Sequence, residues 1–312
     1  MVRSDQERCH QGTIADSLPR LLSAKGFNQA QQFYEARMNA GVQVSLAEGL
    51  AYERFMGRWS RLTGRLFVEW LEIPPQRRWL DVGCGTGAFT EVILSCCDPM
   101  AVVAFDPSER QLAYALSRPR DNRVIFRRGD AMAIDAVDRE FDVAASALVL
   151  NFLPDQAKAV REMSRVVRPG GTVAVYVWDF AGRRNVTQHL NDAIASIAPD
   201  AEGATRSAQQ ANTTTPAALM DLFRSVGLQE IESKSLDITA EFEDFEDYWE
   251  SNTTLISPIN IIGTAGGSLA SDQIVLLKQT LKDKLPKVSS GKIEFGARAW
   301  AIRGMVCHPS RE

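Results

Sequence analysis

The 312-residue sequence predicts an α/β protein with a mostly parallel sheet flanked by helices. Three observations lead to this fold class. Short apolar runs alternate with stretches of helical periodicity, a glycine-rich loop joins the first run to a helix, and acidic residues accompany the ends of the first three runs. Since 45% of the residues are hydrophobic, the chain can bury a large core as one elaborated domain or two.

The first strand leads into the most informative segment, residues 79–87 with the sequence WLDVGCGTG. Glycine lacks a Cβ, so the backbone can turn tightly and approach a ligand closely. The helix expected from about Ala88 directs its N-terminal amides toward that ligand. The spacing G-x-G-x-G differs from the dinucleotide fingerprint G-x-G-x-x-G. Asp81, just ahead of the loop, would repel a pyrophosphate and suits a ligand with an ammonium and a sulfonium; the glycines could also form only a tight turn.

Acidic residues also end the next two predicted strands. Residues 102–105 (VVAF) run into Asp106, whose carboxylate can accept hydrogen bonds from both ribose hydroxyls of an adenosine. Asp106 could instead only cap the helix that begins near Ser108. Residues 124–126 (VIF) lead to Asp130. The order of the acids along three successive strands favours a single nucleotide site.

The next two strands are expected on either side of a helix. Residues 141–148 (FDVAASAL) have the composition of a buried fourth strand, and residues 173–178 (VAVYVW) form the fifth. Pro169 cannot continue the helix expected to end near Val167, and the two glycines after it permit a reversal into the strand.

The C-terminal part is expected to add a helix and two strands. The polar stretch 200–215 is a weak linker candidate, and apolar residues at helical spacing follow from Pro216 to about Gly227. Strands are expected over about 229–239 and about 293–306, so the sheet should have seven strands.

These motifs resemble those of class I S-adenosylmethionine-dependent methyltransferases, in the small-molecule branch that includes the ubiquinone and menaquinone enzymes. The motifs match closely over residues about 50–180, and the rest of the chain matches only in the expected order of its helices and strands. The resemblance implies a Rossmann-like sheet in the order 3-2-1-4-5-7-6 with the last strand antiparallel. It also implies S-adenosyl-L-methionine as cofactor and S-adenosyl-L-homocysteine as product. The cofactor-binding residues that it implies are Asp81, Gly83, Cys84, Gly85, Asp106, Pro107, Asp130, Ala131, Ser146, Ala147 and Leu148.

Residues 51–61 (AYERFMGRWSR) resemble the Y-x-R-x-M-G-R-W-S-R opening of a bacterial subgroup of this family. Their helix is expected over the methionine end of the cofactor. Tyr52 or Trp59 could exclude water beside the sulfonium, where an aromatic face contributes about 0.5–2 kcal/mol, and Arg58 could pair with the cofactor carboxylate. Alternatively, the aromatic residues belong to the core and the arginines are solvated.

The predicted organisation is an N-terminal helical extension, residues 1–50, followed by a methyltransferase domain, residues 51–312. The extension, with a helix around residues 30–38, could cap the pocket or join a neighbouring subunit in a homo-oligomer. A lid or substrate insert is expected over about 241–290. Its apolar run, residues 255–262 (LISPINII), favours a hydrophobic or aromatic acceptor, although packing onto the N-terminal arm would explain it equally well.

Methyl transfer from a sulfonium is an in-line displacement, and a general base is needed only when the acceptor must lose a proton. His189 on the helix after the fifth strand, Asp179 at the end of that strand and Asn151 after the fourth strand are the candidates for the catalytic base or for orienting the acceptor.

Composition excludes several other classes. The net charge of −4 provides no general attraction to nucleic acid or anionic membrane. No apolar run approaches the roughly 20 residues of a membrane-spanning helix, and residues 1–10 are too polar for a signal peptide, so a cytoplasmic protein without membrane insertion is expected. The five cysteines lack paired C-x-x-C spacing, and no metal site or disulfide framework is predicted.

The predicted function is therefore methylation of a small, hydrophobic or aromatic metabolite, in the manner of secondary metabolism. The alternative is a protein of the same fold that only binds the cofactor or catalyses a rearrangement or cyclisation. A nicotinamide dehydrogenase is disfavoured by the acid before the glycine loop. A nucleic-acid amino-methyltransferase is disfavoured because residues 146–152 (SALVLNF) lack its Asn/Asp-Pro-Pro-Tyr/Phe motif.

Overall fold

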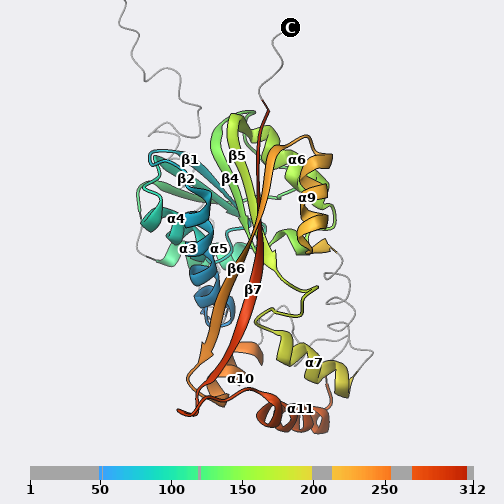
Figure 1. The fold of residues 1–312 in the computed structure, drawn as a ribbon. Coiled ribbons are helices and arrows are strands. Elements are labelled where there is room, and N and C mark those ends of the chain that lie inside the picture. Colours follow the sequence, from blue (N-terminus) through green and yellow to red (C-terminus); the bar gives the residue numbers. More distant parts are fainter. Residues whose placement is uncertain (1–48, 51, 119–120, 199–212, 254–268, 308–312) are drawn as a thin grey trace, which may run out of the picture.

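The computed structural model describes residues 49–50, 52–118, 121–198, 213–253 and 269–307. They form a seven-stranded sheet in the order β3-β2-β1-β4-β5-β7-β6, as predicted, with helices on both faces (Figure 1). The strands are β1 (Arg78–Val82), β2 (Ala101–Asp106), β3 (Val124–Arg128), β4 (Phe141–Ala147), β5 (Val167–Trp178), β6 (Gln229–Phe242) and β7 (Ile293–Met305). The first five are parallel, and β7 runs antiparallel to both β5 and β6.

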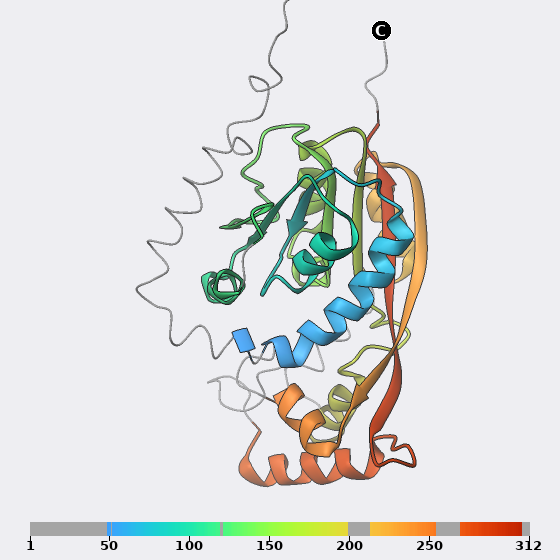
Figure 2. The ribbon, with the colours of Figure 1, turned by 90° about the vertical axis from the view of Figure 1, so that its left-hand side faces the viewer.

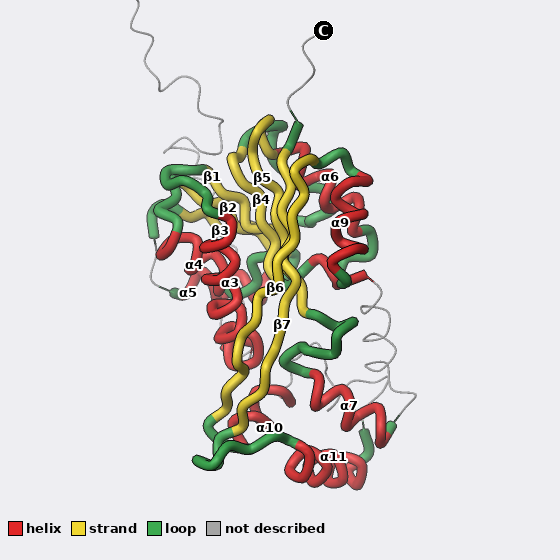
Figure 3. Tube along the Cα trace, viewed as in Figure 1, coloured by secondary structure: helices red, strands yellow, loops and turns green. Residues whose placement is uncertain are grey.

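Helices cover the two faces of the sheet (Figures 1 and 3). One face carries α3 (Arg58–Leu71), α4 (Ala88–Cys96) and α5 (Glu109–Ser117), and the other carries α6 (Gln156–Val166) and α9 (Pro216–Ser225). Successive strand residues point to opposite faces. Trp79 therefore packs in one apolar cluster and Leu80 in the other, and both are fully buried. Burial on both faces explains why β4 is an uninterrupted apolar run apart from Asp142 and Ser146.

The last two strands extend beyond the rest of the sheet. β5 pairs with β7 only as far as Trp178 opposite Ala299, whereas β6 and β7 continue to the pair Phe242 and Ile293. At the far end of this hairpin lie α7 (Gln188–Ile197), α10 (Phe245–Thr253) and α11 (Ser271–Lys284) (Figure 1).

A short π-helix, η2 (Glu53–Gly57), leads directly into α3, and both junction residues have helical φ and ψ. Figure 2 shows the continuous helix formed by η2 and α3, in blue, running between the sheet and the group formed by α10 and α11. A 3-10 turn, η3 (Leu150–Phe152), follows β4. None of the described helices is both long and apolar enough to span a membrane.

Several predicted segments lie outside the described residues. They are the helix around residues 30–38, most of the linker 200–215 and the apolar run 255–262. The division into an extension and a domain stays a prediction. Within the predicted insert, the described part consists of α10, α11 and their flanks.

The structure differs from the sequence prediction at the start of β5. The helix ends one residue early, at Val166, and the strand begins at Val167 instead of after the Pro-Gly-Gly segment. Val167 pairs with Phe141, and the register then shifts. Gly170 donates its backbone N–H to the carbonyl of Val306, whose own N–H donates to Gly171. Because the backbone of Val306, just beyond β7, supplies hydrogen-bond partners for both glycines, they form an irregularity inside the strand and do not end it.

One buried acid joins the starts of three central strands. Asp142 in β4 accepts a hydrogen bond from the backbone N–H of Arg78 in β1 at 2.7 Å and another from Nε of Arg168 in β5 at 2.5 Å. Burial raises the pKa of Asp142, but these hydrogen bonds and the arginine charges outweigh it, so the net pKa is lowered.

We expect Asp142→Asn to reduce the free energy of unfolding by about 1–3 kcal/mol near neutral pH, because charge-assisted hydrogen bonds are lost. The folded pKa lies below the unfolded value of about 4, so the stabilisation is present above that pH and is lost as the pH falls through the folded pKa. In urea unfolding, the difference in free energy of unfolding between variant and wild type should therefore become smaller from about pH 6 to about pH 3. A gap independent of pH would contradict this assignment.

Candidate active site

A cavity of about 390 Å³ lies at the carboxyl ends of β1, β2 and β4. β1 stands between β2 and β4, so this is the point where the winding of the sheet changes direction, the usual ligand crevice of such sheets. Many residues of the predicted cofactor site line it. These are Tyr52, Gly83, Cys84, Gly85, Asp106, Pro107, Asp130, Ala131, Ala147 and Leu148.

The glycine loop presents backbone to the cavity. Gly83 and Gly85 have φ angles of 79° and 55°, which disfavour a side chain. A Cβ on Gly83 would lie 2.6 Å from Cγ2 of Val149. The N–H groups of Gly83 and Cys84 both donate to the carbonyl of Phe105, at 2.8 and 3.0 Å, which holds the loop against the end of β2.

Asp106 is buried at the end of β2 and faces the cavity. Its Oδ2 accepts a hydrogen bond from the backbone N–H of Gly85 at 3.0 Å, and its Oδ1 accepts one from Ser108 at 2.8 Å. Burial raises the pKa of Asp106, and these two hydrogen bonds partly offset the rise. Ser108, not Asp106, caps α5, because its Oγ accepts from the N–H of Gln111. Since each carboxylate oxygen has further lone pairs, Asp106 can accept hydrogen bonds from ligand hydroxyls.

Asp81 and Ser146 lie behind the lining. Asp81 is fully buried; its Oδ2 accepts a hydrogen bond from Oγ1 of Thr90 at 2.6 Å, while its Oδ1 has no partner among the described residues. Burial raises the pKa of Asp81 to about 7, and the nearby Asp106 charge adds to the rise. Ser146 donates to the carbonyl of Val82 and so ties β4 to β1.

One side of the N-terminal arm, defined here as residues 52–61, covers the cavity. Tyr52, Met56 and Ser60 line it, at the spacing of one helical face. Burial and the nearby carboxylates of Asp106 and Glu53 raise the pKa of the Tyr52 phenol, so it stays a protonated hydrogen-bond donor.

The structure does not bring Arg58 and Trp59 to this lining. Arg58 donates hydrogen bonds to Asp247 and Ser251 of α10, and the buried Trp59 packs edge-on against Phe242, with ring centroids 5.2 Å apart. Their predicted contact with a cofactor stays a prediction, and their observed partners lie on the side of the arm that meets α10.

The three candidate catalytic residues lie in different places. Asn151 in η3 lies next to the lining residue Phe152, and its buried Nδ2 has no hydrogen-bond partner within the described chain. Asp179, just after β5, is buried and accepts a hydrogen bond from the N–H of Gly182. His189 on α7 packs against Phe295, and burial lowers its pKa, an effect that Asp192 partly opposes. None of the three side chains lines the cavity.

Sequence reasoning missed several lining residues. Met56 and Ser60 could have been found from their helical spacing to Tyr52. Val149, Phe152 and Leu153 follow β4 because Leu148 adopts a left-handed φ of 62°, which turns the chain across the cavity. A left-handed leucine is unusual, and the sequence gives no signal for it.

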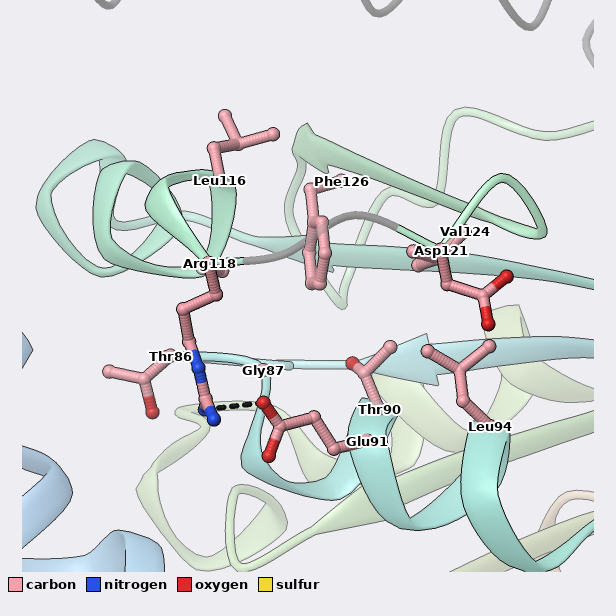
Figure 4. A pocket seen from close by; sticks show the side chains of 11 residues that line it. Thr86, Gly87, Thr90, Glu91, Leu94, Leu116, Arg118, Asp121, Val124 and Phe126 are labelled. Carbon is pink, nitrogen blue, oxygen red and sulfur yellow. Dashed lines mark ion pairs between the residues drawn. The ribbon is translucent and has the colours of Figure 1, made fainter.

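A second hollow lies between α4, α5 and β3 (Figure 4). Its volume of about 40 Å³ has room for only a few waters. Figure 4 shows Arg118 and Glu91 reaching toward each other across it, and they form an ion pair. The cavity beneath the arm is therefore the better candidate for an active site.

Comparison with known families adds an independent observation. Residues 80–175 match the family model described as a methyltransferase domain. The 27-O-demethylrifamycin SV methyltransferase of Amycolatopsis mediterranei is 34% identical over 120 residues, covering 37% of this chain and 43% of that protein. The demethylmenaquinone methyltransferase of a Roseiflexus species is 36% identical over 105 residues, covering 33% and 44%. The chain thus spans about half the length of the curated relatives that it matches.

Solved structures share the fold. A candidate methyltransferase from Bacillus halodurans superposes with a TM-score of 0.51 and 15% identity, covering 78% of this chain and 98% of that one. A Haemonchus contortus phosphoethanolamine N-methyltransferase superposes with a TM-score of 0.52 and 16% identity, covering 93% and 62%. The similarity therefore extends over the sheet and its helices.

We expect Asp81→Asn to gain stability relative to wild type as the pH rises. The folded pKa of about 7 lies above the unfolded value, so the wild type loses stability from about pH 4 up through pH 7, whereas an amide does not ionise. Asn can still accept the hydrogen bond from Thr90. In urea unfolding, the free energy of unfolding of Asp81→Asn should increase relative to that of wild type by on the order of 3 kcal/mol between about pH 4 and pH 8. A relative gain that decreases with rising pH would contradict the raised pKa.

Proposed function

We propose, from the match of residues 80–175 to the methyltransferase domain model, that this chain is a class I S-adenosylmethionine-dependent methyltransferase acting on a small molecule. The observation that carries the proposal is the cavity at the switch point of the sheet, where glycine backbone, a buried aspartate and a covering helix converge. Its volume of about 390 Å³ lies within the usual range for cofactor sites.

The residues present fit S-adenosylmethionine. The absence of a Cβ at Gly83 and Gly85 lets Val149 and Gln111 pack against the loop, whose residues line the cavity, and Asp106 offers free lone pairs for the ribose hydroxyls. The buried, unpartnered Oδ1 of Asp81 and the carboxylate of Asp106 make the surroundings of the loop favourable to a cation. We assign the ribose to Asp106, the adenine to the vicinity of Asp130 and Ala131, and the methionine part to the glycine loop and the arm.

Bound S-adenosylmethionine supplies an electrophilic methyl group. The protein's part is to hold the acceptor in line and to exclude water, and such positioning can supply on the order of 7–11 kcal/mol. Tyr52 and Met56 cover the cavity from the arm. Asn151, whose Nδ2 has no partner within the described chain, is assigned to orient the acceptor.

The proposed acceptor is hydrophobic or aromatic. Phe152 lines the cavity and is 51% exposed, and Leu153, Phe89 and Met56 add apolar surface. Relatives whose names refer to quinone and rifamycin substrates support this class. Because these relatives are named for methyl transfer, the alternative of a protein that binds the cofactor without methylating is not favoured. The absence of a nucleic-acid partner and the homo-oligomer remain predictions.

Asp106→Ala should weaken binding of S-adenosylhomocysteine by about tenfold or more, because charge-assisted hydrogen bonds are lost. Isothermal titration calorimetry at constant pH measures the two dissociation constants. Asp135→Ala is the matched control, since the Asp135 side chain follows the next strand but is 97% exposed. The assignment fails if wild type does not bind the ligand or if both variants bind it equally well.

Asn151→Ala should lower kcat about tenfold or more while leaving the affinity for S-adenosylhomocysteine unchanged, since a group that orients the acceptor acts on the transfer step. Transfer of isotope-labelled methyl from S-adenosylmethionine to a panel of quinols, phenols and aliphatic amines measures both the acceptor class and the effect of the variant. A preference for aliphatic amines would sink the proposed acceptor class.

A further inference from the structure

The arm reaches two parts of the molecule that lie far apart in the sequence. One face of its helix lines the cofactor cavity through Tyr52, Met56 and Ser60. Another side meets α10, which belongs to the group of helices beyond the carboxyl edge of the sheet (Figure 2). No residue of α10 lines the cavity, and among the described elements the arm contacts both.

Arg58 makes the connection to α10. Its Nη1 donates to Oδ2 of Asp247 at 3.1 Å, and its Nη2 donates to Oγ of Ser251 at 2.9 Å. The guanidinium carbon lies 4.5 Å from the ring centroid of Trp59 and 4.4 Å from that of Phe242, so the group packs against both aromatic rings. Both ionic side chains are 32% exposed.

The partner acid is itself fixed in place. Asp247 accepts a hydrogen bond from the backbone N–H of Glu243 at 3.1 Å, and its own N–H donates to Oδ1 of Asp244 at 2.8 Å. Planar, bidentate and stacked contacts of this kind suit arginine and not lysine. The contact therefore orients α10 relative to the arm, which a single exposed ion pair would not achieve.

The other end of the arm is attached to the glycine loop. Glu53 accepts a hydrogen bond from Oγ1 of Thr86 and pairs at 2.6 Å with Arg61, whose Nε lies 3.0 Å from Glu91 of α4. A Cβ on Gly57 would lie 2.4 Å from Oε2 of Glu53, so a glycine here allows this carboxylate to reach its partners. The local π-helix lies between the two attachments, and such segments occur often at functional sites.

We propose that Arg58 is a positioning residue that transmits occupation of the cofactor cavity to α10. Binding of the donor orders the glycine loop and the arm, and the contacts of Arg58 with Asp247 and Ser251 then hold α10 in place. This inference rests on the proposed function, because it takes the cavity as the cofactor site.

Hydrogen exchange with and without S-adenosylhomocysteine tests the inference. In wild type, we expect the ligand to slow exchange in the glycine loop, in the arm and in residues 245–253. In Arg58→Met, the ligand should still slow exchange in the glycine loop and in the arm, and its dissociation constant should stay within about threefold of wild type. The ligand-induced protection of residues 245–253 should fall about tenfold. Arg58→Lys should restore it only partly.

The matched control is Arg54→Met. Arg54 also links the arm to α10, through Glu250 at 3.8 Å, but both side chains are largely exposed, so ligand-induced protection should be unchanged. Asp247→Asn serves as a second disruptive variant if Arg58→Met does not fold.

The possible failures are distinguishable. If the ligand binds and Arg58→Met and Asp247→Asn keep the protection of residues 245–253, the transmission is overturned and the cofactor assignment stands. If Arg58→Met speeds hydrogen exchange in α10 relative to wild type by the same factor with and without ligand, Arg58 has only a structural role and the inference is overturned. If wild type does not bind the ligand, the proposed function falls and the inference with it.

Discussion

The hydrogen bond from the backbone N–H of Gly85 to the carboxylate of Asp106 is the interaction on which the cavity depends. It fastens the glycine loop to the end of β2, and the same carboxylate holds the start of the next segment through Ser108. One buried acid thus sets the relative positions of two walls. Burying it is costly, and the backbone donors offset part of that cost while leaving lone pairs for a ligand.

The two buried acids Asp142 and Asp81 lie at opposite ends of the strands and have different surroundings. Asp142, at the amino ends of the strands, is surrounded by arginines and its pKa is lowered, so it binds strands together. Asp81, at the carboxyl ends, has only a threonine hydroxyl as a described partner, and its pKa is raised. A carboxylate left without a counter-ion favours an incoming cation. The two ends of the sheet are therefore electrostatically distinct: the acid at one end is neutralised by arginines, and Asp81 at the other has no described cationic partner.

Much of the sheet could be predicted because its signals are local. The glycine loop, the acids near the strand ends and the apolar runs each depend on neighbouring residues, and the order of the seven strands followed from the resemblance that these motifs carry. Contacts between distant segments could not be predicted. The sequence around Arg58 suggests a cation near the cofactor, but Asp247 lies 189 residues away and nothing local marks it as a partner. Leu148 likewise turns the chain through a conformation that its residue type disfavours.

The overhanging hairpin has a consequence for how this architecture can vary. From Arg298 back to Ile293, β7 pairs with β6 alone, so α10 and α11 are carried on two strands that extend past the central sheet. The length or sequence of the tip can therefore change without disturbing the pairing of the five parallel strands. The helices at the tip and the parallel part of the sheet are thereby separate modules, and a graft at the tip would leave the pairing of the parallel strands intact.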